Sequence, residues 1–259
     1  AVAAALVAAF KNLDDGYDTV IKKTGATGEA AEELKKNMDN VFGTVPTDAE
    51  TAGIAIGEVN TRFGKTGEAL ENLSAEFIRF SEINDTDLNR SINSTDAIMT
   101  KFNVDASQTK NVLGLITKAG QDTGLSIDTL YSSLEKNGAT LKEMDFDLTE
   151  SVNLLAQFEA NGVDTSTALA GLKKAVANAA KEGKSADKAL EETVENIKNA
   201  SSETEALQIA TELFGTKGAP EMTQAIREGR LSVDNLKNSL SEYGSVVEDT
   251  FNETLDPTD

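Results

Sequence analysis

The segment Asp85-Thr-Asp87-Leu-Asn89 has the acidic and amide spacing that opens a calcium-binding loop of the EF-hand type. Such a loop needs glycine at its sixth position for a sharp turn and usually glutamate at its twelfth, but Arg90 and Asp96 stand there. Without that glycine the oxygen ligands do not converge on one ion. We therefore predict a capped helix start with solvated carboxylates at this segment, and no metal site.

Two short triplets, Gly64–Thr66 and Gly183–Ser185, resemble the end of a phosphate-binding Walker loop. That loop needs another glycine five residues earlier, so that backbone N–H groups can surround a phosphate. Val59 and Asn178 occupy those positions. Each triplet is instead predicted to end one helix at its glycine and to begin the next helix at its Thr or Ser.

A serine nucleophile is suggested by Ser107-Gln-Thr-Lys110, which fits the Ser-x-x-Lys pattern of acyl-transferring enzymes. Lys65-Thr66-Gly67 also fits the Lys-Thr-Gly element of those enzymes, which lies on a strand late in their chains. Here the element comes before the serine, in a sequence with a helical pattern. We interpret the match as a coincidence of composition.

Composition narrows the chemistry further. The 259 residues include no His, Cys or Trp, which excludes a Ser-His triad, a cysteine nucleophile, an imidazole base, a zinc finger and a haem site. Among 44 acidic side chains, no carboxylate pair can be assigned to glycoside hydrolysis. The formal charge of -20 argues against a nucleic-acid surface, because Lys and Arg supply most of the affinity for phosphates. The chain is expected to be no enzyme, to use no cofactor or metal, and to bind no nucleic acid directly.

The elements that carry these residues are predicted to be helices. Only three prolines interrupt the chain. Apolar residues recur at helical spacing, as within residues 168–179, and no segment alternates with the two-residue period of a strand. The predicted helices cover residues 11–23, 27–42, 47–63, 67–83, 88–102, 106–122, 127–137, 148–160, 165–182, 186–199, 203–214, 219–228 and 233–250.

Several predicted helices begin at a capping signal. Capping boxes, in which Ser, Thr or Asp precedes Glu by three residues, are predicted at Thr47, Asp147 and Ser202. Ser126 and Ser232 are predicted N-caps that follow an apolar residue. In each case a side-chain oxygen would accept a hydrogen bond from an otherwise unpaired backbone N–H group.

Glycines suited to a left-handed position follow many of the predicted helices. They are Gly43, Gly64, Gly124, Gly162, Gly183 and Gly215. Three of them come after Phe42, Phe63 and Phe214, and each Phe is expected to anchor the last helical turn in the core. Phe214 is predicted to be buried and Gly215 to be left-handed.

Short connections make successive helices antiparallel. We therefore predict an all-α fold, an irregular array of antiparallel helical hairpins with no sheet. The apolar opening Ala1–Phe10 is shorter than the roughly 20 residues that span a bilayer. It is interpreted as the first turns of a helix that continues to Val20, and the alternative is the tail of a longer apolar segment.

Five sequence blocks follow one another along the chain. They are Thr24-Gly25-Ala-Thr-Gly28-Glu29, Val41–Glu50 around Pro46, Gly124-Leu-Ser126-Ile-Asp128, Gly162-Val-Asp164-Thr-Ser166, and Phe214-Gly215-Thr-Lys-Gly218-Ala-Pro220-Glu-Met222. Their order resembles the conserved core of phage tail tape-measure proteins, of the type found in long-tailed phages and prophages of Gram-positive bacteria. Pro220 departs from the family's small apolar residue, but it falls in a predicted first helical turn, where proline is tolerated.

The resemblance implies a structural virion component, the core domain of a tape-measure protein that acts in tail-tube assembly, length determination and genome delivery. It places the chain inside the virion tail tube, and in the host cytoplasm during assembly. It implies three segments: N-terminal helices at 1–43, the helical core at 44–230, and a C-terminal helix with a cut linker at 231–259.

The partners that the resemblance implies are the tail-tube protein, the tail assembly chaperones, the distal tail hub and further copies of the chain. It also implies membrane contact through the apolar N-terminus of the longer chain, and no catalytic residues. A compact block makes a poor ruler, so an anchoring or assembly role is expected. The alternative is a secreted α-helical adhesin or pore-forming module, which the acidity and the apolar opening would also suit.

Overall fold

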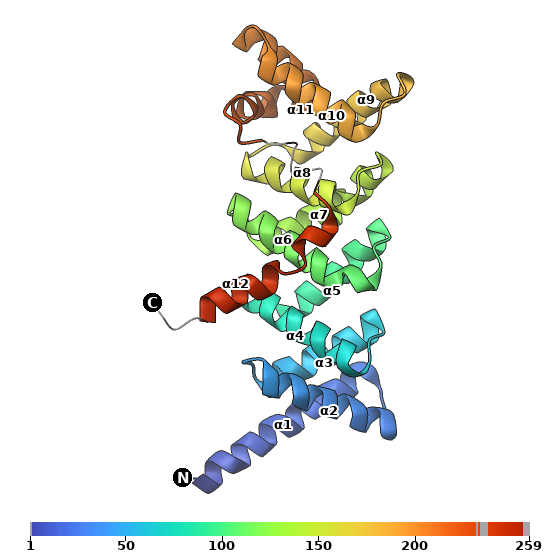
Figure 1. Ribbon diagram of the computed structural model, residues 1–259, viewed down its shortest axis with the longest axis vertical. Coiled ribbons are helices and arrows are strands. Elements are labelled where there is room, and N and C mark those ends of the chain that lie inside the picture. Colours follow the sequence, from blue (N-terminus) through green and yellow to red (C-terminus); the bar gives the residue numbers. More distant parts are fainter. Residues whose placement is uncertain (1, 232, 234–237, 256–259) are drawn as a thin grey trace. The chain divides into compact units, whose positions relative to one another are not determined.

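The computed structural model describes residues 2–231, 233 and 238–255, and within these ranges it describes side chains from residue 13 to residue 254. All the regular elements in these ranges are helices (Figure 1), which confirms the predicted all-α class. The elements are α1 (Val2–Thr24), α2 (Glu29–Thr44), α3 (Ala49–Phe63), α4 (Gly67–Ile83), α5 (Leu88–Phe102), η1 (Ala106–Gln108), α6 (Thr109–Thr123), α7 (Ile127–Glu143), α8 (Leu148–Ala160), α9 (Thr165–Lys181), α10 (Ala186–Asn199), α11 (Glu203–Arg227), η3 (Leu240–Tyr243) and α12 (Val246–Leu255).

The chain forms two compact units. Unit 1 consists of Ala1–Met99, Asp105–Thr117 and Tyr243–Asp259, and unit 2 consists of Thr100–Val104 and Lys118–Glu242. Unit 1 therefore includes a segment from the far end of the sequence. The three segments 1–43, 44–230 and 231–259 rest on the sequence resemblance and stay a prediction. The boundaries of the two units lie elsewhere along the chain and do not test them.

In unit 1, α1 and α3 pack with their backbones in close contact. A Cβ atom at Gly53 would lie 2.5 Å from the carbonyl oxygen of Gly16, and one at Gly16 would lie 2.6 Å from that of Ala49. One turn further along α3, a Cβ atom at Gly57 would lie 2.8 Å from Cβ of Lys23. These glycines let the end of α1 lie directly against α3, and a side chain at any of them would push the helices apart.

The C-terminal helix α12 packs on α4 within unit 1. Tyr243, Val247 and Phe251 follow one another at four-residue spacing and are all buried. Gly114 on α6 has no room for a Cβ atom because the backbone of Tyr243 lies against it. The guanidinium of Arg79 lies 5.7 Å from the centre of the Phe251 ring. A seam of apolar side chains thus joins the end of the sequence to unit 1.

The single helix predicted at 233–250 is wrong in its described part. Residues 240–243 form a 3-10 turn, and α12 begins only at Val246. Gly244 and Ser245 lie between the two, and both are weak helix formers. The predicted N-cap Ser232 lies outside the described residues. The predicted linker Leu255–Asp259 does too, except for Leu255, which is the last residue of α12.

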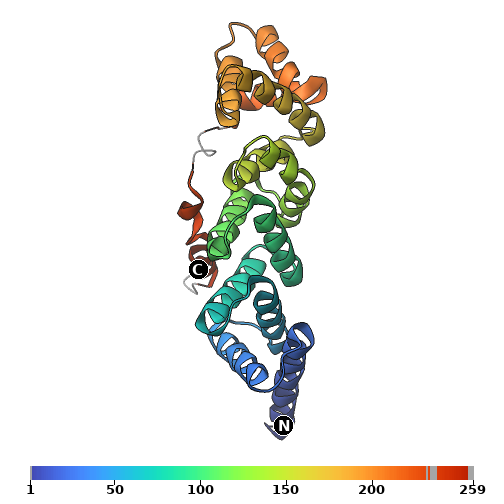
Figure 2. The same cartoon turned by 90° about the vertical axis from the view of Figure 1, so that its right-hand side faces the viewer.

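In unit 2, α7 packs on α8, and α9, α10 and α11 pack on one another (Figures 1 and 2). Tyr131, Phe158 and Phe214 are among its largest fully buried side chains. The helices predicted at 203–214 and 219–228 are the two halves of α11, which bends at Gly215. Gly171 on α9 has no room for a Cβ atom because the backbone of α11 lies against it.

Two of the predicted helix starts are confirmed. Asp147 and Glu150 form a complete capping box, in which each carboxylate accepts a hydrogen bond of 2.8 Å from the backbone N–H of the other residue. The hydroxyl oxygen of Ser126 accepts from the N–H of Thr129 at 3.2 Å. Both caps satisfy donors that the first helical turn leaves unpaired.

Two other predicted boxes differ from the structure. The N-cap of α3 is Asp48, not Thr47, and its carboxylate accepts from the N–H of Thr51 at 2.7 Å. A charged acceptor interacts more favourably with the positive end of the helix dipole than a hydroxyl does. Ser202 does cap α11, but the carboxylate of Glu205 accepts from the N–H of Ser201 and so leaves the box open.

Most of the predicted helix-ending glycines have positive φ. They are Gly64, Gly124, Gly162, Gly183 and Gly215. Gly43 is the exception, because α2 continues through it to Thr44. Phe42 is 39% exposed and anchors nothing, whereas Val41 and Val45 are buried in its place. The expectation that a Phe-Gly pair ends the helix is therefore wrong at this position.

The pair Phe63–Gly64 behaves as predicted. Gly64 is left-handed with φ 61° and ψ 24°, and the Phe63 ring packs on Phe77 at 5.6 Å. The predicted end of a helix at residue 137 is wrong, since α7 continues to Glu143. Gly138 lies inside that helix, and the position suits glycine because a Cβ atom there would lie 3.0 Å from the ring of Phe102.

Candidate functional site

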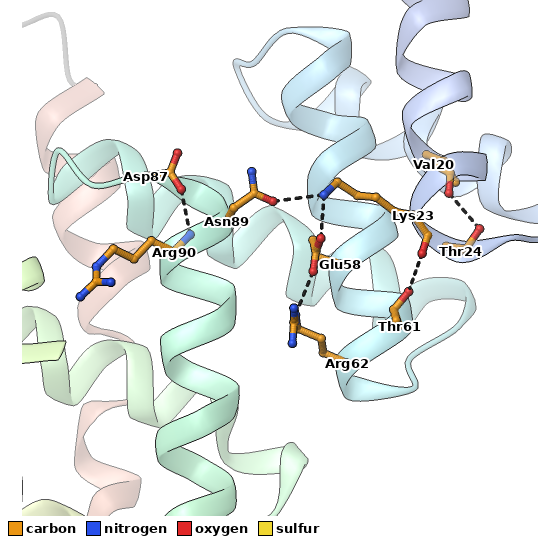
Figure 3. A network of polar contacts seen from close by, with 9 residues as sticks. All are labelled: Val20, Lys23, Thr24, Glu58, Thr61, Arg62, Asp87, Asn89 and Arg90. Atoms are coloured by element: carbon orange, nitrogen blue, oxygen red, sulfur yellow. Dashed lines mark hydrogen bonds and ion pairs between the residues drawn. The ribbon is translucent and has the colours of Figure 1, made fainter. Parts of the chain in front are cut away.

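The first of the five sequence blocks forms the turn between α1 and α2. The hydroxyl of Thr24 donates to the carbonyl of Val20 at 2.8 Å (Figure 3). It also accepts from the N–H of Ala26 at 3.2 Å. Gly25 and Gly28 have φ of 65° and 61°, a region that favours glycine. The block is therefore the residue pattern that this tight turn requires.

Directly before this turn, Lys23 joins three helices of unit 1 (Figure 3). Its Nζ contacts the carboxylate of Glu58 on α3 at 2.6 Å and donates to Oδ1 of Asn89 on α5 at 3.2 Å. Arg62 donates to the other oxygen of Glu58 at 2.8 Å and also pairs with Asp96 at 3.7 Å. The end of α1 is thereby fixed on α3 and on the first turn of α5.

The carboxylate of Glu58 is the centre of this network. Burial alone would raise the pKa of Glu58, but the hydrogen bonds from Lys23 and Arg62 outweigh it and lower the pKa. Both side chains of the Lys23–Glu58 pair are mostly shielded from water, with 25% and 16% exposed. Glu58 therefore stays ionised and the network holds across the neutral pH range.

The segment that resembles a calcium loop is the start of α5. The carboxylate of Asp87 accepts from the N–H of Arg90 at 2.8 Å (Figure 3), which is the predicted cap. Asp96 lies in the ion pair with Arg62. Across the described ranges, no group of three or more acidic side chains could hold a metal ion.

In unit 2, the structure brings two of the blocks together. Gly162 and Asp164 form the turn from α8 to α9, and the block from Phe214 to Met222 runs through the bend of α11. A Cβ atom at Gly218 would lie 3.1 Å from Cγ1 of Val163, in that turn. Motifs about fifty residues apart in the sequence are therefore one packing cluster.

The aromatic and apolar members of this cluster are buried. The Phe214 ring meets Phe158 edge to face, with ring centres 5.9 Å apart, and Met222 has no exposed surface. Asp164 caps α9 by accepting from the N–H of Thr167 at 2.7 Å. The hydrogen bond from the Thr167 hydroxyl is the main reason that the pKa of Asp164 is lowered.

Gly215 is predicted to be left-handed, and the structure corrects this. Its φ is 71°, but its ψ is 167°, so the residue is extended with positive φ. This region is open essentially only to glycine. Gly215 therefore separates the two helical parts of α11 at a kink, and Phe214 stays in the core as predicted.

Two blocks stand apart from these clusters. Gly124 has φ 71°, and its N–H bonds to the carbonyl of Gly120 at 2.8 Å, just before the Ser126 cap of α7. Pro46 lies exposed in the turn between α2 and α3. These residues shape local turns.

The residues of the apparent acylation motif do share a cavity of 560 Å³ in unit 1. Lys65, Ser107 and Lys110 line it, together with Glu76 and Glu248. Burial alone would lower the pKa of Lys110, but its 2.8 Å contact with Glu248 and the charge of Glu76 outweigh burial and raise the pKa. A lysine that acts as a general base must be neutral. The geometry thus supports ion pairing and leaves the serine without a base.

Residues 28–227 match the family model of the phage-related minor tail proteins. This chain belongs to that family. The matched residues include Glu58, which pairs with Lys23, and the whole packing cluster formed by the α8–α9 turn and α11. Helix α12 lies beyond the match. No curated protein and no solved structure matches the chain.

Family membership makes this minor tail protein a structural component of phage tails that interacts with other tail components. In the described part of the chain, no helix combines the length and apolarity needed to cross a membrane. Val2, Leu6 and Phe10, which we expect to be adhesive, have side chains outside the described set.

Sequence reasoning missed the residues that join helices across a unit. The network of Lys23 and Glu58 and the cluster of Glu76 and Lys110 consist of ordinary charged residues in an acidic chain. One signal was available for the first, because Gly53 and Gly57 at four-residue spacing indicate a close helix crossing. Nothing in the sequence indicates the second.

Proposed function

We propose that this chain is the core domain of a tail tape-measure protein from a long-tailed phage or prophage of a Gram-positive host. In this role it lies inside the tail tube and acts in tube assembly, length determination and genome delivery, after assembly in the host cytoplasm. The observation that carries the proposal is the match of residues 28–227 to a tail family, together with the order of the five blocks.

Within the tape-measure protein, this domain contributes by anchoring or assembling the tube, and its own length is not the ruler. A helix rises about 1.5 Å per residue, so residues 28–227 would span roughly 300 Å as one straight helix. In unit 1, however, α2 packs on α3 and α4, and in unit 2, α9 packs on α10 and α11. Because neighbouring helices pack side by side, their lengths do not add along one axis.

The proposed partners are the tail-tube protein, the tail assembly chaperones, the distal tail hub and other copies of the chain. The proposed mode is protein contact without catalysis and without direct DNA binding, in keeping with the charge of -20 and the protonated Lys110. The family membership favours this role over a secreted adhesin or pore-forming module.

The test is an in-frame deletion of residues 28–227 from the parent gene, followed by electron microscopy of the particles. We expect tails to be absent or irregular in length. Tails shortened uniformly by roughly 300 Å would instead make the segment a ruler. Tails of normal length and infectivity would contradict the proposal. A tagged chain should also leave the tube when DNA ejection is triggered, and retention would contradict the delivery role.

A further inference from the structure

The two halves of α11 line a cavity of 640 Å³ in unit 2 that the motif cluster does not use. Glu203 and Leu207 lie on its wall from the first half of the helix, and Pro220, Glu221 and Thr223 lie on it from the second half. We call this the α11 groove. Its size falls within the range of about 300 to 1,000 Å³ that is usual for binding pockets.

The groove exposes apolar surface. Leu207 is 38% exposed, and Phe42 in unit 1 is the other large hydrophobic residue that is exposed among the described side chains. Pro220 is exposed as well. Covering exposed apolar side chains with a partner lowers the free energy, so Leu207 and Pro220 offer a contact surface for a partner in the groove.

Thr223 supplies an independent indication. It is only 4% exposed, and its hydroxyl oxygen has no hydrogen-bond partner. A threonine in a helix commonly donates to the carbonyl one turn earlier, as Thr211 does to Leu207 at 2.6 Å. A buried hydroxyl without a partner is unfavourable. Because Thr223 lines the groove, its buried hydroxyl can reach a ligand atom there by turning to the other χ1 rotamer that a helical threonine adopts.

The rim of the groove is mostly acidic, with Glu203, Glu221 and Glu228 beside one cation, the exposed Arg227. Glu203 and Glu221 are exposed, and neither makes an ion pair within the described ranges. Glu228 is already bonded to Gln224 and Arg230 at 2.8 Å. Two carboxylates thus remain to bind cations beside the apolar wall. A second copy of a chain with a charge of -20 would be repelled overall, so a basic partner fits this rim better.

We propose that the α11 groove docks a basic amphipathic helix of another protein. The apolar side chains of that helix pack on Leu207 and Pro220, and its Lys or Arg side chains pair with Glu203 and Glu221. One polar atom of the helix forms a hydrogen bond with Thr223. A helix is the fitting shape because the groove lies between two helical segments, which is a common mode of peptide recognition. The inference goes beyond the tape-measure role, because it assigns a surface and a partner chemistry and does not depend on that role.

The test uses a fluorescent Leu/Lys peptide of about five helical turns and a matched Leu/Glu peptide, with binding followed by anisotropy at physiological salt. We expect saturable binding of the Leu/Lys peptide and at least about tenfold weaker binding of the Leu/Glu peptide. Leu207→Ser should weaken binding about tenfold. Phe42→Ser is the matched control at the other exposed hydrophobic and should leave binding unchanged.

Charge variants separate the groove from the general acidity of the chain. Glu203→Lys with Glu221→Lys should reverse the preference, so that the Leu/Glu peptide binds more tightly. Glu29→Lys with Glu33→Lys changes the net charge equally at exposed positions of α2 and should preserve the original preference. Equal effects of the two double variants would overturn the proposal, as would absence of Leu/Lys binding.

Thr223→Val gives two readouts of opposite sign. It removes the unpartnered hydroxyl, so the Tm of the free protein should rise. It also removes the hydrogen bond to the docked helix, so binding should weaken about fivefold. A rise in Tm with unchanged binding would contradict the assigned contact. If sedimentation shows a dimer that Leu207→Ser dissociates, the occupant is a second copy and the proposal is overturned.

Discussion

Gly215→Ala should destabilise unit 2 by more than a Gly→Ala substitution does at an ordinary left-handed helix end. Gly215 has φ 71° and ψ 167°, and an L-residue held in such a region is strained by about 1–3 kcal/mol. A Cβ atom at this position would also overlap the Cγ2 methyl of Thr167. A Gly→Ala substitution at a simple left-handed position has no such overlap and costs about 1 kcal/mol.

Thr167 is exposed, but its side chain can turn away from the new methyl group only by giving up the hydrogen bond of its hydroxyl to Asp164. Its N–H bonds to Asp164 at 2.7 Å, and its hydroxyl also bonds to that carboxylate. A β-branched side chain in a helix has few alternative rotamers. Relief of the overlap then costs about 1 kcal/mol, the usual worth of one hydrogen bond, so the total expected loss is about 2–4 kcal/mol.

Urea unfolding followed by far-UV circular dichroism measures this loss. Gly183→Ala is the matched control, because Gly183 has φ 74° and no atom near the added Cβ, and it should cost about 1 kcal/mol. Combining Gly215→Ala with Thr167→Ala removes the overlap but not the backbone strain, so about 1 kcal/mol of the loss should return. The double-mutant cycle then gives the coupling between the two positions.

Two results would refute this reasoning. The first is a cost at Gly215 no larger than the cost at Gly183. The second is a coupling between Thr167 and Gly215 below about 0.5 kcal/mol, which is the additivity expected of independent sites.

Three further predictions concern unit 1 and the charge of the chain. Gly53→Ala should destabilise the protein by about 2–4 kcal/mol in urea unfolding, because the new Cβ atom would lie 2.5 Å from the backbone oxygen of Gly16. The control Gly43→Ala should stabilise it by about 0.5–1 kcal/mol, because nothing lies near the new Cβ atom at this position inside α2. Burial raises the pKa of Glu76 in spite of Lys110 and Arg79, so the folded state holds its proton more tightly than the unfolded chain, and this stabilising contribution is lost as pH rises through the folded pKa. Glu76→Gln should therefore raise stability at neutral pH and raise it by less near the ordinary pKa of glutamate. Equal effects at both pH values in thermal unfolding would contradict the role of burial. Duplex DNA should show no measurable binding in a shift assay at physiological salt, and tight, salt-sensitive binding would contradict the repulsion expected at a charge of -20.

The helices and many of their ends could be predicted because their determinants are local. Apolar residues at three- and four-residue spacing define a buried helical face wherever the chain goes, so helices such as α4 and α8 are predicted with their observed bounds. The Asp147 box and the left-handed Gly64 depend on backbone groups within one turn. Where two adjacent residues can both cap a helix, as Thr47 and Asp48 can, the sequence pattern predicts the N-cap only to within one residue.

The candidate site could be predicted only as a set of separate motifs. Residues such as Gly25, Gly28 and Asp164 were found because turns and caps require them locally. Their grouping was not predictable, because the contact of Val163 with Gly218 joins segments that no sequence period relates. The same holds for Lys23, whose partners lie on two other helices.

By itself, the sequence determined an acidic all-helical chain without His or Cys and the turns between its helices. The break between residues 214 and 219 could be predicted from Gly215, but only the tertiary structure decided its extended backbone angles, because the two parts of α11 pack on Phe158 and Val163. The tertiary structure also decided that α12 packs on α4, with Tyr243 against Gly114. Burial and close packing arise from residues distant in the chain, so no local pattern of sequence can specify them.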